Sequence, residues 1–162
     1  MARSVGTVLF FRHRGFFPSL IRVWTQSTWD HVAIITYSDS LQRMILEAVP
    51  GGARLRSIKP SEGYWWTIPE HMLDASPAEI GKLVDYAYAH TGVPYDWAND
   101  LRAAFDLPRA RTRRRQCVEL VVGALRAAGL VVPSGILTPE HLADYLCGKV
   151  GSCMCCRLEQ TP

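Results

Sequence analysis

The chain is organised around the stretch Arg115-Gln-Cys-Val-Glu-Leu-Val-Val-Gly-Ala-Leu-Arg-Ala-Ala-Gly129, in which a lone interior cysteine heads an amphipathic pattern. The apolar side chains recur at helical spacing, at Val118, Val121, Val122 and Leu125. Gly129 stands where the end of a helix favours a residue that tolerates a positive φ. The pattern therefore predicts a buried helix with Cys117 in its first turn.

That position would change the chemistry of Cys117. The first turn of a helix has unsatisfied backbone N–H groups and the positive end of the helix dipole, and both favour an anion. A cysteine there has its thiolate stabilised, and the thiolate is the nucleophile. The alternative is that Cys117 is a small apolar filler, since free cysteines are among the most buried residues.

The size and composition predict one soluble globular domain. The chain has 162 residues, of which 48% are hydrophobic and 20% charged, and its formal net charge is +3. This charge is too small to indicate nucleic-acid binding, and we expect no nucleic-acid partner. No repeat or linker divides the sequence, so we expect a single catalytic domain over residues 1–150 and a cysteine-rich tail over 151–162.

Nothing in the sequence predicts export by the usual secretory route. No apolar run approaches the ~18 residues that cross a bilayer. The first residues, Met1 to Arg14, have too short an apolar core for a signal peptide. We therefore expect a cytoplasmic protein as synthesised, with leaderless export left open.

The five cysteines are Cys117, Cys147, Cys153, Cys155 and Cys156. An odd number with four near the end does not resemble a disulfide framework, which favours a reducing compartment. The last four could offer thiolates to zinc, but adjacent Cys155 and Cys156 fit the usual spaced ligand pairs poorly. We therefore expect no metal and no other cofactor.

The pattern of elements is that of an α+β protein. Apolar, β-branched and aromatic runs predict strands over 5–11, 30–37, 43–49, 53–58 and 64–68. Helices are predicted over 15–24, 76–90, 98–105, 117–129 and 138–145, with a capping box at Ser76 and a threonine cap at Thr138. Strands followed by helices indicate an antiparallel sheet packed against helices.

A catalytic cysteine needs a base, and His31 is the candidate because it opens the strand 30–37. Glu47 is the candidate to orient the imidazole, because it is the only acid on the strand expected to pair with that of His31. Asp30 and Asp39 are alternatives for that third position. His31 could also be an ordinary structural histidine, and Glu47 an exposed residue on a solvated strand face.

Four segments resemble one known family. Residues 5–12 with 17–34, Ile45 to Leu55, Gly92 to Asp96 and Gln116 to Val121 are similar, in this order, to motifs of the permuted, YiiX-like branch of the NlpC/P60 cysteine hydrolases. The resemblance covers residues 5 to about 145. One departure is Val118, where the family often has serine.

The resemblance implies a circularly permuted papain-like fold in which Cys117, His31 and Glu47 form the catalytic triad. It implies cleavage of an amide or ester through an acyl-enzyme, with a peptidoglycan stem peptide as the leading substrate. Lipid or lipoprotein deacylation or acyl transfer is the alternative, and a non-catalytic binding module on the same fold is the competing class.

Other residues have weaker assignments. Tyr95 is expected to line the cleft and Trp29 to wall the acyl pocket, although each could be simple packing. The arginine-rich run Arg109 to Arg115 could contact an anionic surface, or be a solvated loop. The expected partner is a peptide or acyl-lipid substrate, and the sequence leaves the oligomeric state open.

Overall fold

The computed structural model describes residues 5–13, 19, 22–23, 27–39, 42–58, 66–68, 75–96, 116–136 and 138–150. The described elements, in chain order, are β1 (Val8–Phe11), β2 (His31–Ser38), β3 (Arg43–Val49), β4 (Gly52–Ile58), β5 (Trp66–Ile68), α2 (Pro77–His90), α4 (Cys117–Ala127) and α5 (Pro139–Val150). The predicted helix 98–105, the arginine run 109–115, the tail 151–162 and most of the predicted helix 15–24 lie outside these residues.

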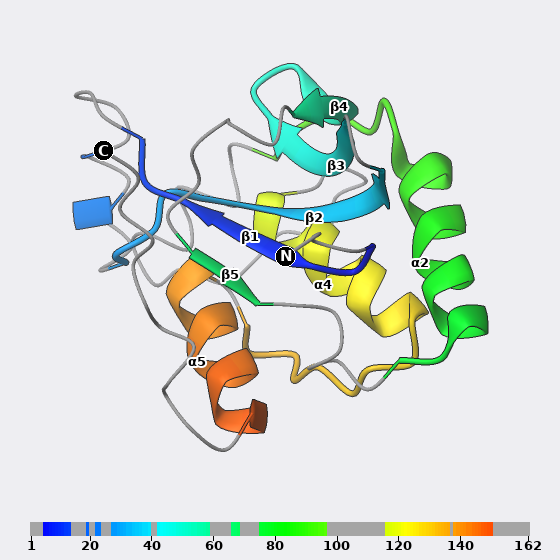
Figure 1. Cartoon of the computed structure of the whole chain (residues 1–162). Coiled ribbons are helices and arrows are strands. Elements are labelled where there is room, and N and C mark those ends of the chain that lie inside the picture. The colour runs from blue at the N-terminus through cyan, green and yellow to red at the C-terminus, as the bar shows by residue number, and fades with distance from the viewer. Residues whose placement is uncertain are drawn as a thin grey trace.

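The five strands form one antiparallel sheet in the order β4-β3-β2-β1-β5. The five described strands precede α2, α4 and α5 along the chain, in agreement with the α+β prediction, and β2 occupies the centre of the sheet. In Figure 1, α4 lies across the sheet behind β2. The helix α2 is beside α4, and α5 is near the edge of the sheet that is formed by β5. The helix that carries Cys117 thus packs on the two strands that carry His31 and Glu47.

A tight turn joins β3 to β4, as the Pro-Gly-Gly sequence predicts. Val49 pairs with Gly52, whose φ of +111° is accessible mainly to glycine. A Cβ at Gly52 would also lie 2.9 Å from the carbonyl oxygen of Val93. This close approach lets the Ala53 N–H donate to the Val93 carbonyl at 2.8 Å, which attaches the segment after α2 to the sheet.

Strand side chains alternate between two buried clusters. The larger, which we call the helix-side cluster, contains the even-numbered apolar residues of β1, β2 and β3 together with buried residues of the three described helices. The second cluster consists of Leu9, Phe11, Ala33, Ile35, Ile45 and Ile58. Both faces of the sheet are therefore apolar, which explains the uneven pattern of β4: Ala53 and Leu55 face the helices, whereas Ile58 faces the second cluster.

The predicted helix boundaries have identifiable caps. The Oγ of Ser76 accepts from the N–H of Glu79, and the Glu79 carboxylate accepts from the N–H of Ser76, which completes the capping box of α2. The Oγ1 of Thr138 accepts from the N–H of His141 at 3.2 Å. Gly129 follows α4 with a φ of +83°, as expected. The last helix differs from the prediction, because it continues to Val150 rather than ending near Tyr145.

Among the described residues, the longest helices are too short or too polar to traverse a lipid bilayer.

We predict that Gly123→Ala destabilises the contact between α2 and α4. A Cβ there would lie 2.0 Å from the hydroxyl oxygen of Tyr86, whose ring stacks on His90 at 3.8 Å and so resists displacement. Forcing a methyl group into a packed contact costs about 1–3 kcal/mol. Urea unfolding measures this loss.

The matched control is Gly81→Ala on α2, where nothing lies within 4 Å of the new Cβ. That substitution should raise the free energy of unfolding by roughly 0.5–1 kcal/mol, since alanine favours a helix over glycine. Equal effects of the two substitutions would contradict the proposed packing.

Candidate functional site

The loop before β2 is held to α5, and this fixes where β2 begins. The Glu140 carboxylate accepts from the N–H of Thr28 at 2.7 Å and from the hydroxyl of Ser27 at 3.4 Å. The Ser27 hydroxyl oxygen in turn accepts from the N–H of Trp29 at 3.1 Å. His31 follows as the first residue of β2. Its backbone is therefore fixed from both sides, by this loop and by the sheet.

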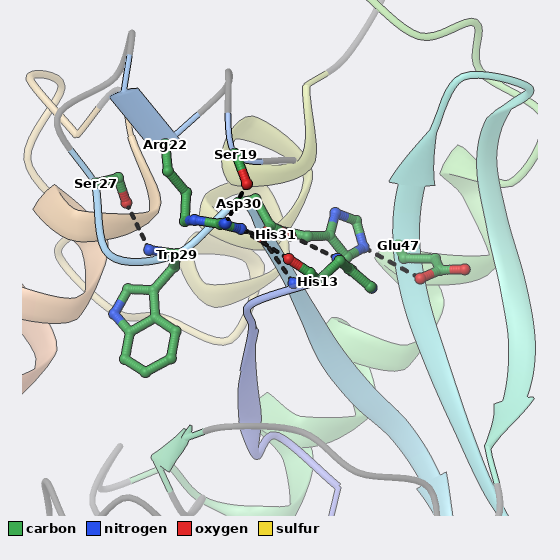
Figure 2. Close-up of polar contacts among 8 residues, drawn as sticks. All are labelled: His13, Ser19, Arg22, Ser27, Trp29, Asp30, His31 and Glu47. Atoms are coloured by element: carbon green, nitrogen blue, oxygen red, sulfur yellow. Dashed lines mark hydrogen bonds and ion pairs between the residues drawn. The ribbon is translucent and has the colours of Figure 1, made fainter. Parts of the chain in front are cut away.

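His31 and Glu47 come together across β2 and β3. The register pairs Ala33 with Glu47, and the alternation of side chains puts His31 on the same face two residues earlier. The Nε2 of His31 lies 3.1 Å from Oε2 of Glu47 (Figure 2), and their side chains are only 12% and 4% exposed. The alternative that Glu47 occupies a solvated strand face does not hold, because its carboxylate is buried.

Two arginines of β4 complete the surroundings of Glu47. Arg54 contacts Oε1 through Nε at 2.8 Å and through Nη2 at 2.7 Å, and Nε of Arg56 lies 3.1 Å from the same oxygen. Burial by itself would raise the pKa of Glu47. The hydrogen bond and charge of His31, the hydrogen bond of Arg54 and the charge of Arg56 outweigh burial and lower that pKa to about 2. Glu47 is therefore a carboxylate at any physiological pH.

Cys117 is the first residue of α4, as predicted. Its side chain is 7% exposed and belongs to the helix-side cluster, together with Trp29 and Val32. The helix α4 as a whole packs on β2 and β3. The apolar packing fits the filler alternative as well as a nucleophile at a helix N-terminus.

The His31 ring itself lies on the other side of the sheet from the helix-side cluster. Phe11 is its register partner, and the two ring centroids are 5.5 Å apart. Phe11 belongs to the second cluster. Within the described part of the chain, Glu47 is the hydrogen-bond partner found for this ring. Any contact with Cys117 must therefore be made around the first residue of β2, where the strand ends.

The two predicted substrate-binding residues both pack in the helix-side cluster. Trp29 is 7% exposed and its ring lies 5.9 Å from that of Phe10, as in a core aromatic. Tyr95 is partly buried against the same cluster. A role of either residue in substrate binding stays a prediction.

Neither alternative orienting acid contacts His31. Asp30 bonds instead to His13 and Arg22, through contacts of 2.5 Å each. Asp39 accepts from the N–H of Gln42 at 2.7 Å and from the hydroxyl of Tyr37 at 3.0 Å, which closes the turn between β2 and β3.

Two sets of contacts were not predicted from the sequence: those of Arg54 and Arg56 with Glu47, and the pairing of His13 with Asp30. The arginine pair had a signal, since Arg54 and Arg56 alternate with Ala53 and Leu55 on a strand next to that of Glu47. His13 and Asp30 are 17 positions apart, and no sequence pattern indicated that they would pair.

The fold and the site define an α+β protein in which a buried cysteine heads the central helix and a histidine–glutamate pair joins two neighbouring strands. The crystal structure of the metalloprotein YiiX from Escherichia coli O157:H7 has a similar fold, with a TM-score of 0.52 and 18% identity over 96% of this chain and 87% of that one. No protein-family model and no curated protein matches the sequence. The likeness establishes a YiiX-like fold.

The word metalloprotein describes that neighbour, and its fit can be tested against the residues of this chain. In the ranges that the structure describes, no three His, Cys, Asp or Glu side chains gather closely enough to hold one ion. Stable protein sites for transition metals usually supply at least three such ligands. The described residues therefore do not fit a metal centre.

We predict that Glu47 makes stability fall in acid. Its pKa is about 2 in the folded protein against 4.5 for an ordinary glutamate, so the folded state loses up to about 3 kcal/mol relative to the unfolded state as the pH falls from about 5 to 2. Urea unfolding of the wild type and of Glu47→Gln at a series of pH values should show this slope only in the wild type.

Glu79→Gln is the control. The capping-box bonds of Ser76 also lower the pKa of Glu79, but this carboxylate lies near the surface of α2, where solvent screens its interactions, so the variant should keep most of the slope. The wild type also gives a direct measurement, the NMR titration of the Glu47 carboxyl carbon. A midpoint near 4.5 would contradict the buried ion pairs.

Proposed function

We propose that this protein is a thiol hydrolase of the permuted, YiiX-like NlpC/P60 type, with a circularly permuted papain-like fold. Cys117 is the nucleophile, His31 is the general base, and Glu47 is the residue that positions His31. The YiiX-like fold supports the proposal, as does the order of the motifs around these residues along the chain.

The hydrogen bond between His31 and Glu47 is the observation that carries this proposal. Glu47 is ionised, so Nε2 of His31 donates its proton to Oε2, and in the neutral form of the ring the lone pair is on Nδ1. A fixed tautomer with an accepting nitrogen is what a cysteine nucleophile requires from its base. Glu47 also stabilises the imidazolium that forms when His31 takes the thiol proton.

The reaction follows from these roles. The thiol proton passes to Nδ1 of His31, and the sulfur attacks an acyl carbon to give a tetrahedral oxyanion. The N–H of Cys117 at the start of α4 is placed to stabilise that oxyanion. The imidazolium returns its proton to the leaving amine or alcohol as the carbon–leaving-group bond breaks. Water, deprotonated by His31, then cleaves the thioester and restores the thiol.

The proposed mechanism requires the side chains of Cys117 and His31 to come into contact. The sulfur comes from the helix-side cluster and the imidazole from the side of Phe11, so they meet only around the first residue of β2. His31 is the first residue of β2, so its side chain lies at the end of the strand. An amide of a peptide, such as a peptidoglycan stem peptide, is the proposed substrate, and esters are cleaved by the same steps.

We predict that Cys117→Ala abolishes acyl-enzyme formation. Incubation of the wild type with peptidoglycan fragments, or separately with acyl-lipids, should add an acyl mass to the peptide that contains Cys117. The variant should give no adduct, since no other residue is proposed to form the thioester. Mass spectrometry of the digested protein locates the adduct and identifies its donor.

Cys147→Ala is the matched control, because Cys147 is a second free thiol, half-buried on α5. It should leave the adduct at Cys117 in place. An adduct that persists in Cys117→Ala would exclude this residue as the nucleophile.

We predict that the Cys117 thiol is activated by His31. Its alkylation by iodoacetamide should stay fast well below pH ~8.5, the ordinary pKa of a thiol. In His31→Gln, which keeps a donor for Glu47 and removes the base, the midpoint should return toward that value. A profile with an ordinary midpoint in the wild type would instead favour a binding module on the same fold.

A further inference from the structure

A second imidazole–carboxylate pair lies beside the first. Nδ1 of His13 is 2.5 Å from Oδ1 of Asp30, and the N–H of His13 donates to Oδ2 at 2.8 Å (Figure 2). The His13 ring stacks parallel to that of Phe11, at a centroid distance of 5.7 Å. It lies 6.0 Å from the ring of His31. Two histidines, each bound to a buried carboxylate, therefore share the end of β1 and β2.

In both histidine–carboxylate sites the negative groups are more deeply buried than the positive groups. The side chains of Asp30 and Glu47 are only 3% and 4% exposed. Their cationic partners are more accessible: the side chains of His13, Arg54 and Arg56 are 54%, 53% and 31% exposed. In each pair the carboxylate is therefore the buried member and the cationic group the more accessible one. A ligand that approaches either pair meets the cationic group first.

His13 has one ring nitrogen left for such a ligand. Asp30 engages Nδ1, and in the described part of the chain Nε2 has no hydrogen-bond partner. The hydrogen bond to Asp30 raises the pKa of His13 above 6.5. Burial lowers this pKa, the charges of Asp30 and Glu47 raise it, and that of Arg22 lowers it. The net effect favours an imidazolium, whose Nε2–H is a charged donor.

We propose that His13, whose ring lies 6.0 Å from that of His31, forms a subsite that binds an anionic oxygen group, a carboxylate or a phosphate. This subsite lies beside His31. It names the substrate class of the proposed hydrolase, an acyl compound with a negative group near the bond that is cleaved. That last step rests on the proposed function, whereas the binding of an anion does not.

Asp30 has a positioning role in this subsite. Its two oxygens hold the ring and the backbone of His13, and Oδ2 also contacts Nη1 of Arg22. The buried carboxylate is thus neutralised by two cations, and the ring orientation is set before a ligand arrives. Preorganisation of this kind lowers the entropic cost of binding.

The test is an NMR titration of the wild-type protein near pH 6.5, with the imidazole C–H signals of His13 and His90 as probes. Sodium phosphate, sodium acetate and sodium chloride are added at matched ionic strength. Phosphate or acetate should shift the His13 signal along a saturable curve and raise its pKa. The His90 signal should stay unchanged, because that ring is bonded to the Tyr86 carbonyl on α2.

The three salts separate the outcomes. Tighter binding of phosphate assigns a phosphate group to the ligand, and tighter binding of acetate assigns a carboxylate. An equal shift with chloride, or no saturable shift with any salt, would overturn the subsite. These readings do not involve Cys117, so failure of the hydrolase proposal and failure of this one are distinguishable.

A second experiment measures the anion affinity of the variant His13→Gln, with the imidazole C–H signal of His31 as the probe. The substitution removes the charge but keeps a polar side chain of similar reach. Anion affinity reported by His31 should fall about tenfold, the size expected for one charge-assisted hydrogen bond. Unchanged affinity in a folded variant would place the anion elsewhere.

Discussion

The buried carboxylate of Glu47 is the constraint on which the rest of the site depends. It joins three strands, because its own strand is β3, its first partner His31 opens β2, and Arg54 and Arg56 belong to β4. A carboxylate can be buried at this depth only if such partners compensate its lost hydration. The same partners keep it ionised, so the charge that orients His31 is permanent.

The sheet divides the chemistry of the molecule between its two faces. The helix-side cluster holds Cys117 at the start of α4, and the opposite face holds the imidazoles and the arginines. In the proposed mechanism the two meet at the start of β2, next to the loop that the bonds of Glu140 fix in place. An apolar environment for the thiol next to a cationic surface suits a nucleophile that must be shielded from water and a substrate that carries charge.

Much of the fold follows from local sequence patterns. The limits of β3 and α2, the capping box at Ser76 and the positive φ at Gly129 were all predicted, because each depends on residues close in sequence. The end of α5 was not, since nothing local stops that helix at Tyr145. The register of β4 does not follow from its sequence either, because its apolar residues belong to two different clusters.

Of the site, the sequence by itself determined the residue types and their elements: a cysteine at a helix N-terminus, a histidine at a strand start and one acid on a neighbouring strand. Only the tertiary structure decided that Asp30 pairs with His13 rather than His31, and that Glu47 is buried between one imidazole and two guanidiniums. The physical reason is that periodicity assigns a side chain to a face of its own element. Which charges then share that face depends on strand order and register, and these are set by contacts between residues distant in sequence.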